Sequence, residues 1–244
     1  MKTETVILDP VRPDVTLTSY ILPGCRPAML VLPGGGFYAL ASHEGDPFAI
    51  RFMAEGFNAF VLNYSIGKPK SFFPRPLTDV SAAIVHIREN AEKYCIDPDK
   101  LFVIGSSAGG YLAGAIGAMW HCDFTKSSPD MEYGANRPNG VILTYGVVST
   151  REDIRCFCFD NLVTEEYGEQ AVSLERYVDE KSAPAFIWHS FPDECVDPRN
   201  ALVLAEAYVR AKVPCELHLY PDGQHGIGLG DPEKYPRSSR WTYE

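Results

Sequence analysis

The chain has 244 residues, of which 45% are hydrophobic and 22% are charged, and its formal net charge is −10. This composition is ordinary for a globular protein, and the length fits one α/β domain, so we expect residues 1–244 to form a single domain. The negative charge argues against nucleic acid and anionic membrane surfaces as partners, and it favours a neutral or cationic small molecule.

The sequence shows no sign of a targeting or membrane segment. No apolar stretch of signal-peptide length follows Met1, and no segment approaches the roughly 18 consecutive apolar residues of a membrane span. The seven cysteines are scattered and odd in number, which suits free thiols in a reducing compartment. We therefore expect a cytoplasmic protein.

Cys156 and Cys158 suggest a redox or metal site only weakly, because no second ligand pair stands at zinc-site spacing, and no metal is expected.

Short apolar or β-branched runs alternate with helical stretches along the chain. In chain order, we expect strands at 15–22 and 28–32, a helix at 46–55, a strand at 58–63, a helix at 76–94, a strand at 101–104, a helix at 111–120, strands at 141–145 and 185–189, a helix at 198–212 and a strand at 216–220. This alternation predicts a mostly parallel central sheet with helices on both faces.

Residues 147–182 interrupt the alternation, because they are rich in charged and aromatic residues and have no clean period. The segment fits either a small lid over a site or a long connection, and we favour the lid. In that interpretation Phe157 and Phe159 line the pocket for an acyl group or a sugar.

Residues 105–109 read Gly-Ser-Ser-Ala-Gly, directly between an expected strand and an expected helix. Two glycines around a serine permit a sharp strand-to-helix turn that exposes the middle hydroxyl, here that of Ser107. We therefore expect Ser107 to be a catalytic nucleophile. The alternative is a tight turn that happens to contain two serines.

A serine nucleophile needs a base, and after this kind of turn the acid and then the histidine follow in the chain. His225 lies in a glycine-containing loop after the last expected strand and is the expected base. Asp193 and Asp197 both follow the preceding strand. Asp197 stands before Pro198 at a helix start, where it could cap free amides. We therefore expect Asp193 to orient His225, with Asp197 as the alternative acid.

The negative oxygen that forms during acyl transfer needs convergent N–H donors. One expected donor is the amide of Ala108, next to the nucleophile at a helix start. The others are expected from the loop Pro33-Gly34-Gly35-Gly36-Phe37, and we name Gly35 and Gly36. A phosphate-binding loop or a plain turn is the alternative, although the loop lacks the Gly-Lys-Ser/Thr ending of a nucleotide P-loop.

Taken together, these motifs resemble the α/β-hydrolase superfamily, and more closely its bacterial acetyl-esterase group, which includes bifunctional feruloyl and acetyl-xylan esterases. The resemblance runs over most of the chain, through residues 32–37, 44–45, 60–64, 105–110, 184–189, 216–220 and 223–226. In this alignment the catalytic acid falls on Asp193. The chain departs from the group at Asp197, where proline is usual, and in ending soon after Trp241, which predicts a shortened C-terminus.

The resemblance implies an α/β-hydrolase fold with a small lid insertion at about 147–182. It also implies a serine esterase that cleaves short acyl esters, acetyl or feruloyl, of plant-derived saccharides through an acyl-enzyme. The expected partner is a small-molecule ester, no cofactor is needed, and the sequence leaves a homo-oligomer open. Two other functions are compatible with the sequence: an amidase or peptidase, such as a formamidase, on the same fold, and a non-catalytic binding protein.

Overall fold

The computed structural model describes residues 1–243, and its centre is an eight-stranded sheet with the strand order β1-β2-β4-β3-β5-β6-β7-β8. The strands β1 and β2 pair antiparallel, as do β2 and β4, and all other neighbours pair parallel. The prediction of a mostly parallel sheet is therefore confirmed. The strands are β1 (Lys2–Ile7), β2 (Thr16–Ile21), β3 (Arg26–Leu32), β4 (Asn58–Asn63), β5 (Ile96–Ser106), β6 (Gly140–Thr144), β7 (Ala185–Ser190) and β8 (Cys215–Tyr220).

The central strands are buried on both faces, which is why they read as continuous apolar runs in the sequence. In β3, Ala28, Leu30 and Leu32 face one hydrophobic cluster, whereas Met29 and Val31 face another. This division follows from the alternation of side chains along a strand. The sheet therefore separates two cores, one on each of its faces.

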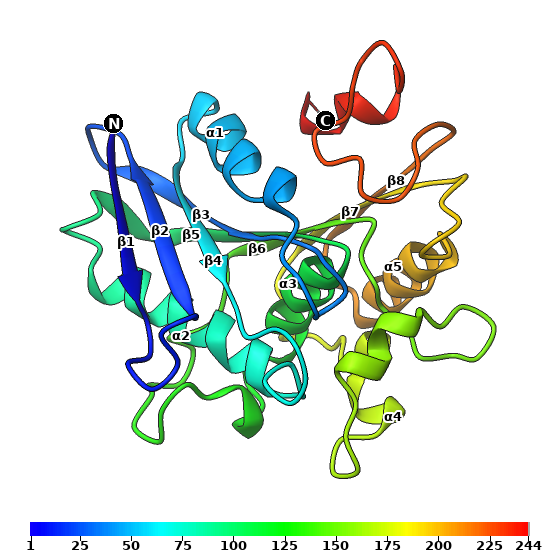
Figure 1. Cartoon of the computed structure of the whole chain (residues 1–244), viewed down its shortest axis with the longest axis horizontal. Coiled ribbons are helices and arrows are strands. Elements are labelled where there is room, and N and C mark those ends of the chain that lie inside the picture. Colours follow the sequence, from blue (N-terminus) through cyan, green and yellow to red (C-terminus); the bar gives the residue numbers. More distant parts are fainter. Residues whose placement is uncertain (244) are drawn as a thin grey trace.

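Helices cover both faces, as predicted (Figure 1). The helix α1 (Asp46–Ala54) lies on one side together with the C-terminal segment, and its Phe48 packs against Trp241. The other side carries α2 (Arg75–Glu89), α3 (Ala108–Met119) and α5 (Arg199–Ala211). All twelve residues of α3 are buried, so this helix is the centre of the larger core.

Several features differ from the sequence-based expectation, among them the starts of β5 at Ile96 rather than Leu101 and of α3 at Ala108 rather than Tyr111. β1 was not predicted, because it is an edge strand with mostly exposed, polar residues and lacks an apolar run. α2 ends at Glu89 rather than near Tyr94, since the side chain of Asn90 donates to the carbonyl of His86 and closes the last turn. Residues 147–182 contain three short helices, η3 (Phe157–Asn161), α4 (Glu169–Val172) and η4 (Leu174–Arg176).

Candidate active site

Ser107 stands alone between the end of β5 and the start of α3. Its φ and ψ of 53° and −115° are unusual for a residue with a side chain, and its neighbours hold it there. Its amide donates to the Thr144 carbonyl at 3.0 Å. A Cβ on Gly109 would lie 2.1 Å from the Leu32 carbonyl oxygen, so only glycine permits α3 to start this close to β3. The turn thus has the strained shape of a nucleophile elbow.

The structure brings together the three side chains that the sequence suggested for catalysis. Nε2 of His225 lies 2.8 Å from Oγ of Ser107, and Nδ1 of the same ring lies 2.8 Å from Oδ2 of Asp193. The three residues follow β5, β7 and β8, and these parallel strands end at the same edge of the sheet. That edge is where α/β sheets generally place their ligands.

The carboxylate of Asp193 is fully hydrogen-bonded. Its Oδ1 accepts from the amides of Cys195 and Val196, both at 2.9 Å, and its Oδ2 faces His225 and His189. Burial alone would raise the pKa of Asp193, but the hydrogen bonds from His189 and His225 outweigh it and hold the pKa well below its usual value. The carboxylate therefore stays ionised beside His225 at neutral pH.

His189 is a neighbour of Asp193 that the sequence did not reveal. Its Nε2 lies 3.1 Å from Oδ2 of Asp193 and 2.9 Å from the carbonyl oxygen of Val196, and the side chain is completely buried. Both neighbours are acceptors, so this nitrogen carries the proton. His189 lies at the end of β7, as expected, but its contact with the acid depends on the fold of the next loop.

Asp197, the alternative acid, lies at the start of α5. Its Oδ1 accepts from the amide of Arg199 at 2.8 Å, and the carboxylate also bonds the Arg199 guanidinium. This agrees with the capping interpretation, although α5 begins at Arg199, one residue later than the proline position suggested. Asp193 is the carboxylate that contacts His225.

Three free amides lie around Ser107. Gly35 and Gly36 line the same cavity as Ser107 and His225. Within residues 1–243, their amides donate no hydrogen bond, and neither does that of Ala108, the first residue of α3. The carbonyl of Gly36 accepts from Asn161 at 3.0 Å, which anchors the loop to the 147–182 segment. These donors resemble the usual arrangement for binding an oxyanion.

The cavity beside Ser107 has a volume of about 210 Å³. Exposed aromatic rings of Tyr38 and Phe157 lie on its wall, together with the thiols of Cys156, Cys158 and Cys195. Phe157 thus occupies the pocket wall, as the sequence suggested. The same expectation for Phe159 is wrong, because its ring is buried in the core and packs edge-on against Tyr111.

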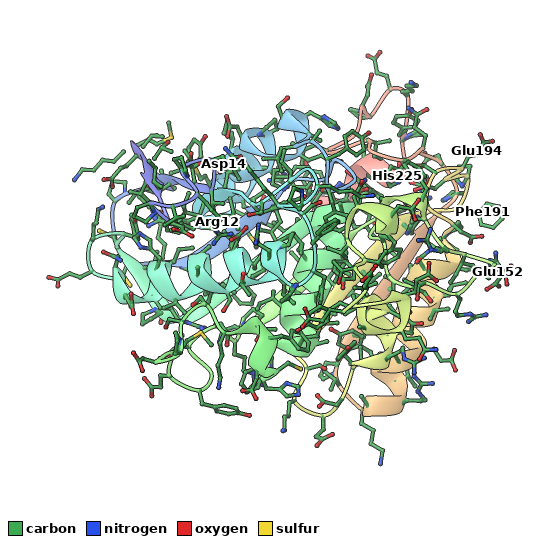
Figure 2. All side chains as sticks on the ribbon, turned by 60° about the horizontal axis from the view of Figure 1, so that its bottom comes forward. Arg12, Asp14, Glu152, Phe191, Glu194 and His225 are labelled. Atoms are coloured by element: carbon green, nitrogen blue, oxygen red, sulfur yellow. The ribbon has the colours of Figure 1, made fainter. Side chains whose placement is uncertain are left out.

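The end of the molecule that carries His225 bears charged residues of both signs. Glu152, Glu194 and Phe191 lie at this end, far from Arg12 and Asp14 (Figure 2). Glu152 and Glu194 share a surface cavity of about 360 Å³ with Asp193. Arg155 lines the same cavity, and Arg199 pairs with the carboxylates of Asp153 and Asp197 beside it.

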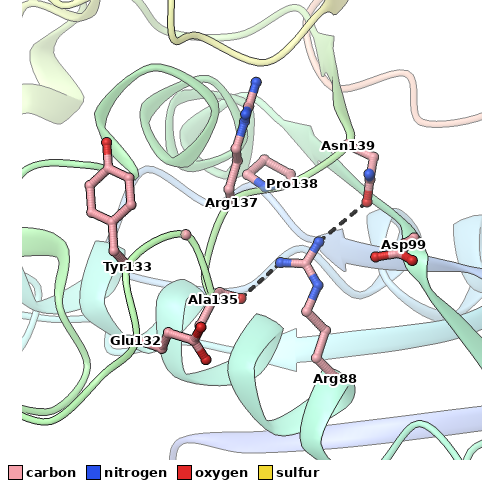
Figure 3. Close-up of a pocket in the computed structure, with 9 residues that line it drawn as sticks. Arg88, Asp99, Glu132, Tyr133, Ala135, Arg137, Pro138 and Asn139 are labelled. Carbon is pink, nitrogen blue, oxygen red and sulfur yellow. Dashed lines mark hydrogen bonds between the residues drawn. The ribbon is translucent and has the colours of Figure 1, made fainter.

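A cavity of about 500 Å³ lies near the amino ends of β5 and β6, at the opposite edge of the sheet from Ser107 (Figure 3). Its Arg88 guanidinium is already bonded to the carbonyls of Pro98 and Ala135 and to the side chain of Asn139. These bonds join α2 to the loop before β6, so Arg88 has a structural role there.

Residues 1–243 contain no helix long and apolar enough to cross a membrane. In the same range, no group of three or more His, Cys, Asp or Glu side chains could hold a metal ion.

A mostly parallel sheet whose nucleophile elbow is followed by an acid and a histidine after later strands defines an α/β hydrolase. Solved structures agree. The acetyl ester-xyloside bifunctional hydrolase from Caldicellulosiruptor lactoaceticus matches with a TM-score of 0.83 and 31% identity, covering 98% of this chain and 93% of that one. A carboxylesterase from Lactobacillus plantarum matches with a TM-score of 0.86 and 25% identity, covering 100% and 94%.

The BD-FAE family model matches residues 22–208, more than half of the chain, and the protein belongs to this family of α/β-hydrolase esterases. It is 36% identical over 224 residues to endo-1,4-beta-xylanase B of Butyrivibrio fibrisolvens, and 30% identical over 221 residues to an acetylxylan esterase of Xylanibacter ruminicola. These matches cover 89% and 85% of this chain, but only 34% and 42% of the two relatives. The chain thus spans less than half the length of these two relatives.

Proposed function

We propose that this protein hydrolyses short acyl esters, above all acetyl esters of plant-derived saccharides, with Ser107 as nucleophile, His225 as base and Asp193 as orienting acid. The observation that carries the proposal is the continuous chain of contacts from Ser107 Oγ through both ring nitrogens of His225 to Asp193, each at 2.8 Å. A serine hydroxyl is a weak nucleophile on its own, and this contact supplies the base that it needs.

The reaction proceeds in two halves. Oγ of Ser107 attacks the ester carbonyl while its proton passes to Nε2 of His225, and the imidazolium then protonates the leaving alcohol. Water attacks the resulting acyl-enzyme and gives its proton to the same nitrogen. The imidazolium then returns this proton to Oγ of Ser107 as the acid is released, which restores the free serine and the neutral histidine. Asp193 holds the ring with Nδ1 protonated and stabilises the imidazolium in both halves.

The negative oxygen that forms in each half is bound by amides. Gly35, Gly36 and Ala108 supply these donors. Their N–H groups have no partner among residues 1–243, Gly35 and Gly36 line the cavity of Ser107, and Ala108 is the next residue in the chain. Such donors act in the transition state more than in the ground state, so they lower the barrier rather than only tightening substrate binding.

The cavity favours a small acyl group. Its volume of about 210 Å³ is below the range of roughly 300–1,000 Å³ that is usual for drug-sized ligands. The exposed rings of Tyr38 and Phe157 offer flat apolar surfaces for a sugar on the alcohol side. The names of the relatives, a xylanase and an acetylxylan esterase, agree with this substrate class.

The test compares the wild-type protein with Ser107→Ala on p-nitrophenyl acetate and acetylated xylo-oligosaccharides. We expect the substitution to lower kcat by at least about 1,000-fold, because residues of a catalytic triad act as a unit. Ser106→Ala is the matched control, since Ser106 is adjacent and buried but bonds Thr144 instead of His225. Equal rates for wild type and Ser107→Ala would overturn the proposal.

The same panel separates the remaining alternatives. Butyryl and feruloyl esters test the acyl size, and peptide and formyl-amide substrates test an amidase or peptidase. A strong preference for amides would replace the proposed ester substrate. No turnover and no labelling of Ser107 by a fluorophosphonate would favour a binding protein. The cytoplasmic location and the oligomeric state stay predictions of the sequence.

A further inference from the structure

A buried carboxylate lies directly beneath the glycine loop and has no part in the proposed triad. Oε2 of Glu44 accepts from the amide of Gly34 at 2.8 Å, and the residue is only 2% exposed. A Cβ on Gly34 would lie 2.6 Å from this Oε2 and 3.0 Å from Cβ of Ser107. Glu44 therefore touches the loop at the point where the loop passes closest to the nucleophile.

The other oxygen of Glu44 leads to the histidine loop. Oε1 accepts from the hydroxyl of Tyr145 at 2.7 Å, and this hydroxyl in turn accepts from the amide of Gly228 at 3.0 Å. Gly228 is three residues past His225. The ring of Tyr145 also packs edge-on against the imidazole of His225, with the ring centres 5.2 Å apart.

Two further contacts reinforce this connection. Nε2 of His43, next to Glu44, lies 3.0 Å from the carbonyl oxygen of Gly226, next to His225. Tyr145 is itself fixed at the end of β6, where its amide donates to the carbonyl of Trp188 at 2.8 Å and its ring is fully buried. The loop that carries Gly35 and Gly36 and the loop that carries His225 are thus joined to one rigid point of the sheet.

We propose that Glu44 and Tyr145 are positioning residues that set the distance between the oxyanion-binding loop and the catalytic histidine. This inference rests on the proposed function, because it assigns roles relative to Ser107 and His225. The two groups do not touch the reacting atoms; they act through the backbone of Gly34 and Gly228 and through the face of the imidazole.

The chemistry of the bridge requires a carboxylate and a phenol. Both partners of Glu44, the Gly34 amide and the Tyr145 hydroxyl, are donors, so both of its oxygens must accept. Glutamine at this position would turn an NH₂ group toward one of these donors. Facing Gly34 it would lose the bond to that amide, and facing Tyr145 it would force the phenol hydroxyl to accept instead of donate. Phenylalanine at position 145 would keep the ring beside His225 but leave the Gly228 amide and a Glu44 oxygen without their partner.

The experiment measures kcat and KM for p-nitrophenyl acetate in Glu44→Gln, Tyr145→Phe and the double variant. Tyr20→Phe is the matched control, because its hydroxyl also bonds a carboxylate, that of Asp46, at 2.7 Å, but away from Ser107. We expect kcat to fall roughly 10- to 100-fold in each single variant with KM within about threefold, because the lost alignment matters only in the transition state. The control should keep kcat within about twofold.

A boronic acid that forms a tetrahedral adduct with serine gives a second readout, because it mimics the negative transition state. Its affinity should fall in parallel with kcat/KM across the variants, which a purely structural role would not cause. The double variant should lose little more than one single variant, because both changes break the same bridge.

Folded Glu44→Gln and Tyr145→Phe proteins with wild-type kcat and boronic acid affinity would overturn the inference. If Glu44→Gln fails to fold, Tyr145→Phe decides alone, since it removes a single oxygen. Ser107→Ala is measured in the same experiment. If Ser107→Ala turns over substrate like the wild type, the proposed function itself fails. If Ser107→Ala is inactive while Glu44→Gln and Tyr145→Phe keep wild-type activity, only the inference about Glu44 and Tyr145 fails.

Discussion

His189 and His225 share one oxygen of Asp193: Nε2 of His189 lies 3.1 Å from Oδ2, and Nδ1 of His225 lies 2.8 Å from the same atom. The two rings approach the carboxylate from different elements, β7 and the loop after β8. A carboxylate held by two imidazoles and two backbone amides has a single orientation. His189 therefore helps to hold the Asp193 carboxylate in the orientation in which it contacts Nδ1 of His225.

Replacing His189 tests this arrangement. We expect His189→Leu to lower kcat/KM roughly 10- to 100-fold, because a hydrogen bond to a charged group contributes about 1.5–3 kcal/mol. His189→Gln, which retains a donor, should recover part of the loss. His218→Gln is a suitable control, since His218 lies on β8 and bonds Glu216 rather than the triad. Equal kinetics for His189→Leu and wild type would show that the second imidazole is dispensable.

The pKa of Asp193 also predicts how stability depends on pH. Because the folded pKa is lowered, the ionised carboxylate stabilises the fold fully above its ordinary pKa of about 4, and this stabilisation is lost as pH falls toward the folded value. The difference in the free energy of unfolding between wild type and Asp193→Asn should stay constant from about pH 7 to 5 and shrink below about pH 4.

Urea unfolding of both proteins at a series of pH values measures this difference. A constant difference down to about pH 2 would mean that folding does not lower the pKa of Asp193, and the proposed stabilisation of its carboxylate by His189 and His225 would be wrong.

The position of Phe157 on the cavity wall predicts that it contributes to the binding of the sugar part of the substrate. Its ring is 61% exposed on the cavity wall, and it lies on η3, which Asn161 links to Gly36. We expect Phe157→Ala to raise KM for acetylated xylo-oligosaccharides several-fold, because the lost aromatic contact is worth about 1 kcal/mol of binding free energy. The kcat for p-nitrophenyl acetate should stay nearly unchanged. Phe191→Ala removes an equally exposed ring that does not line this cavity, and it should change neither value. Identical effects of the two variants would exclude Phe157 as a sugar contact.

The strands were predictable from the sequence where burial on both faces produced an unbroken apolar run, as in β4. β1 was missed because an exposed edge strand has no such run, and its place depends on pairing with β2. The end of α2 was misplaced because it depends on one bond from Asn90. Periodicity cannot reveal a contact of that kind.

The residues of the candidate site likewise fall into those that the sequence predicted and those that it did not. Ser107 was predictable because the elbow is a local pattern. Asp193 and His225 were predictable because the acid and the histidine follow the serine in a known chain order, each after an expected strand. The catalytic roles of all three stay predictions. Glu44 and His189 lie in segments that carry the family resemblance, but their contacts, and that of Tyr145, could not be predicted, since each depends on a partner that the fold brings near. Phe159 was misassigned because an aromatic residue in an irregular segment suits a core as well as a pocket.

The most direct test of the account is to identify the residue that carries the acyl group. The protein is incubated with a fluorophosphonate, which reacts with an activated serine, and the modified peptide is sequenced by mass spectrometry. The account predicts one adduct on Ser107, and no adduct in His225→Ala, where the serine has lost its base. Ester hydrolysis by a protein whose adduct lies on another residue, or that forms none, would contradict it.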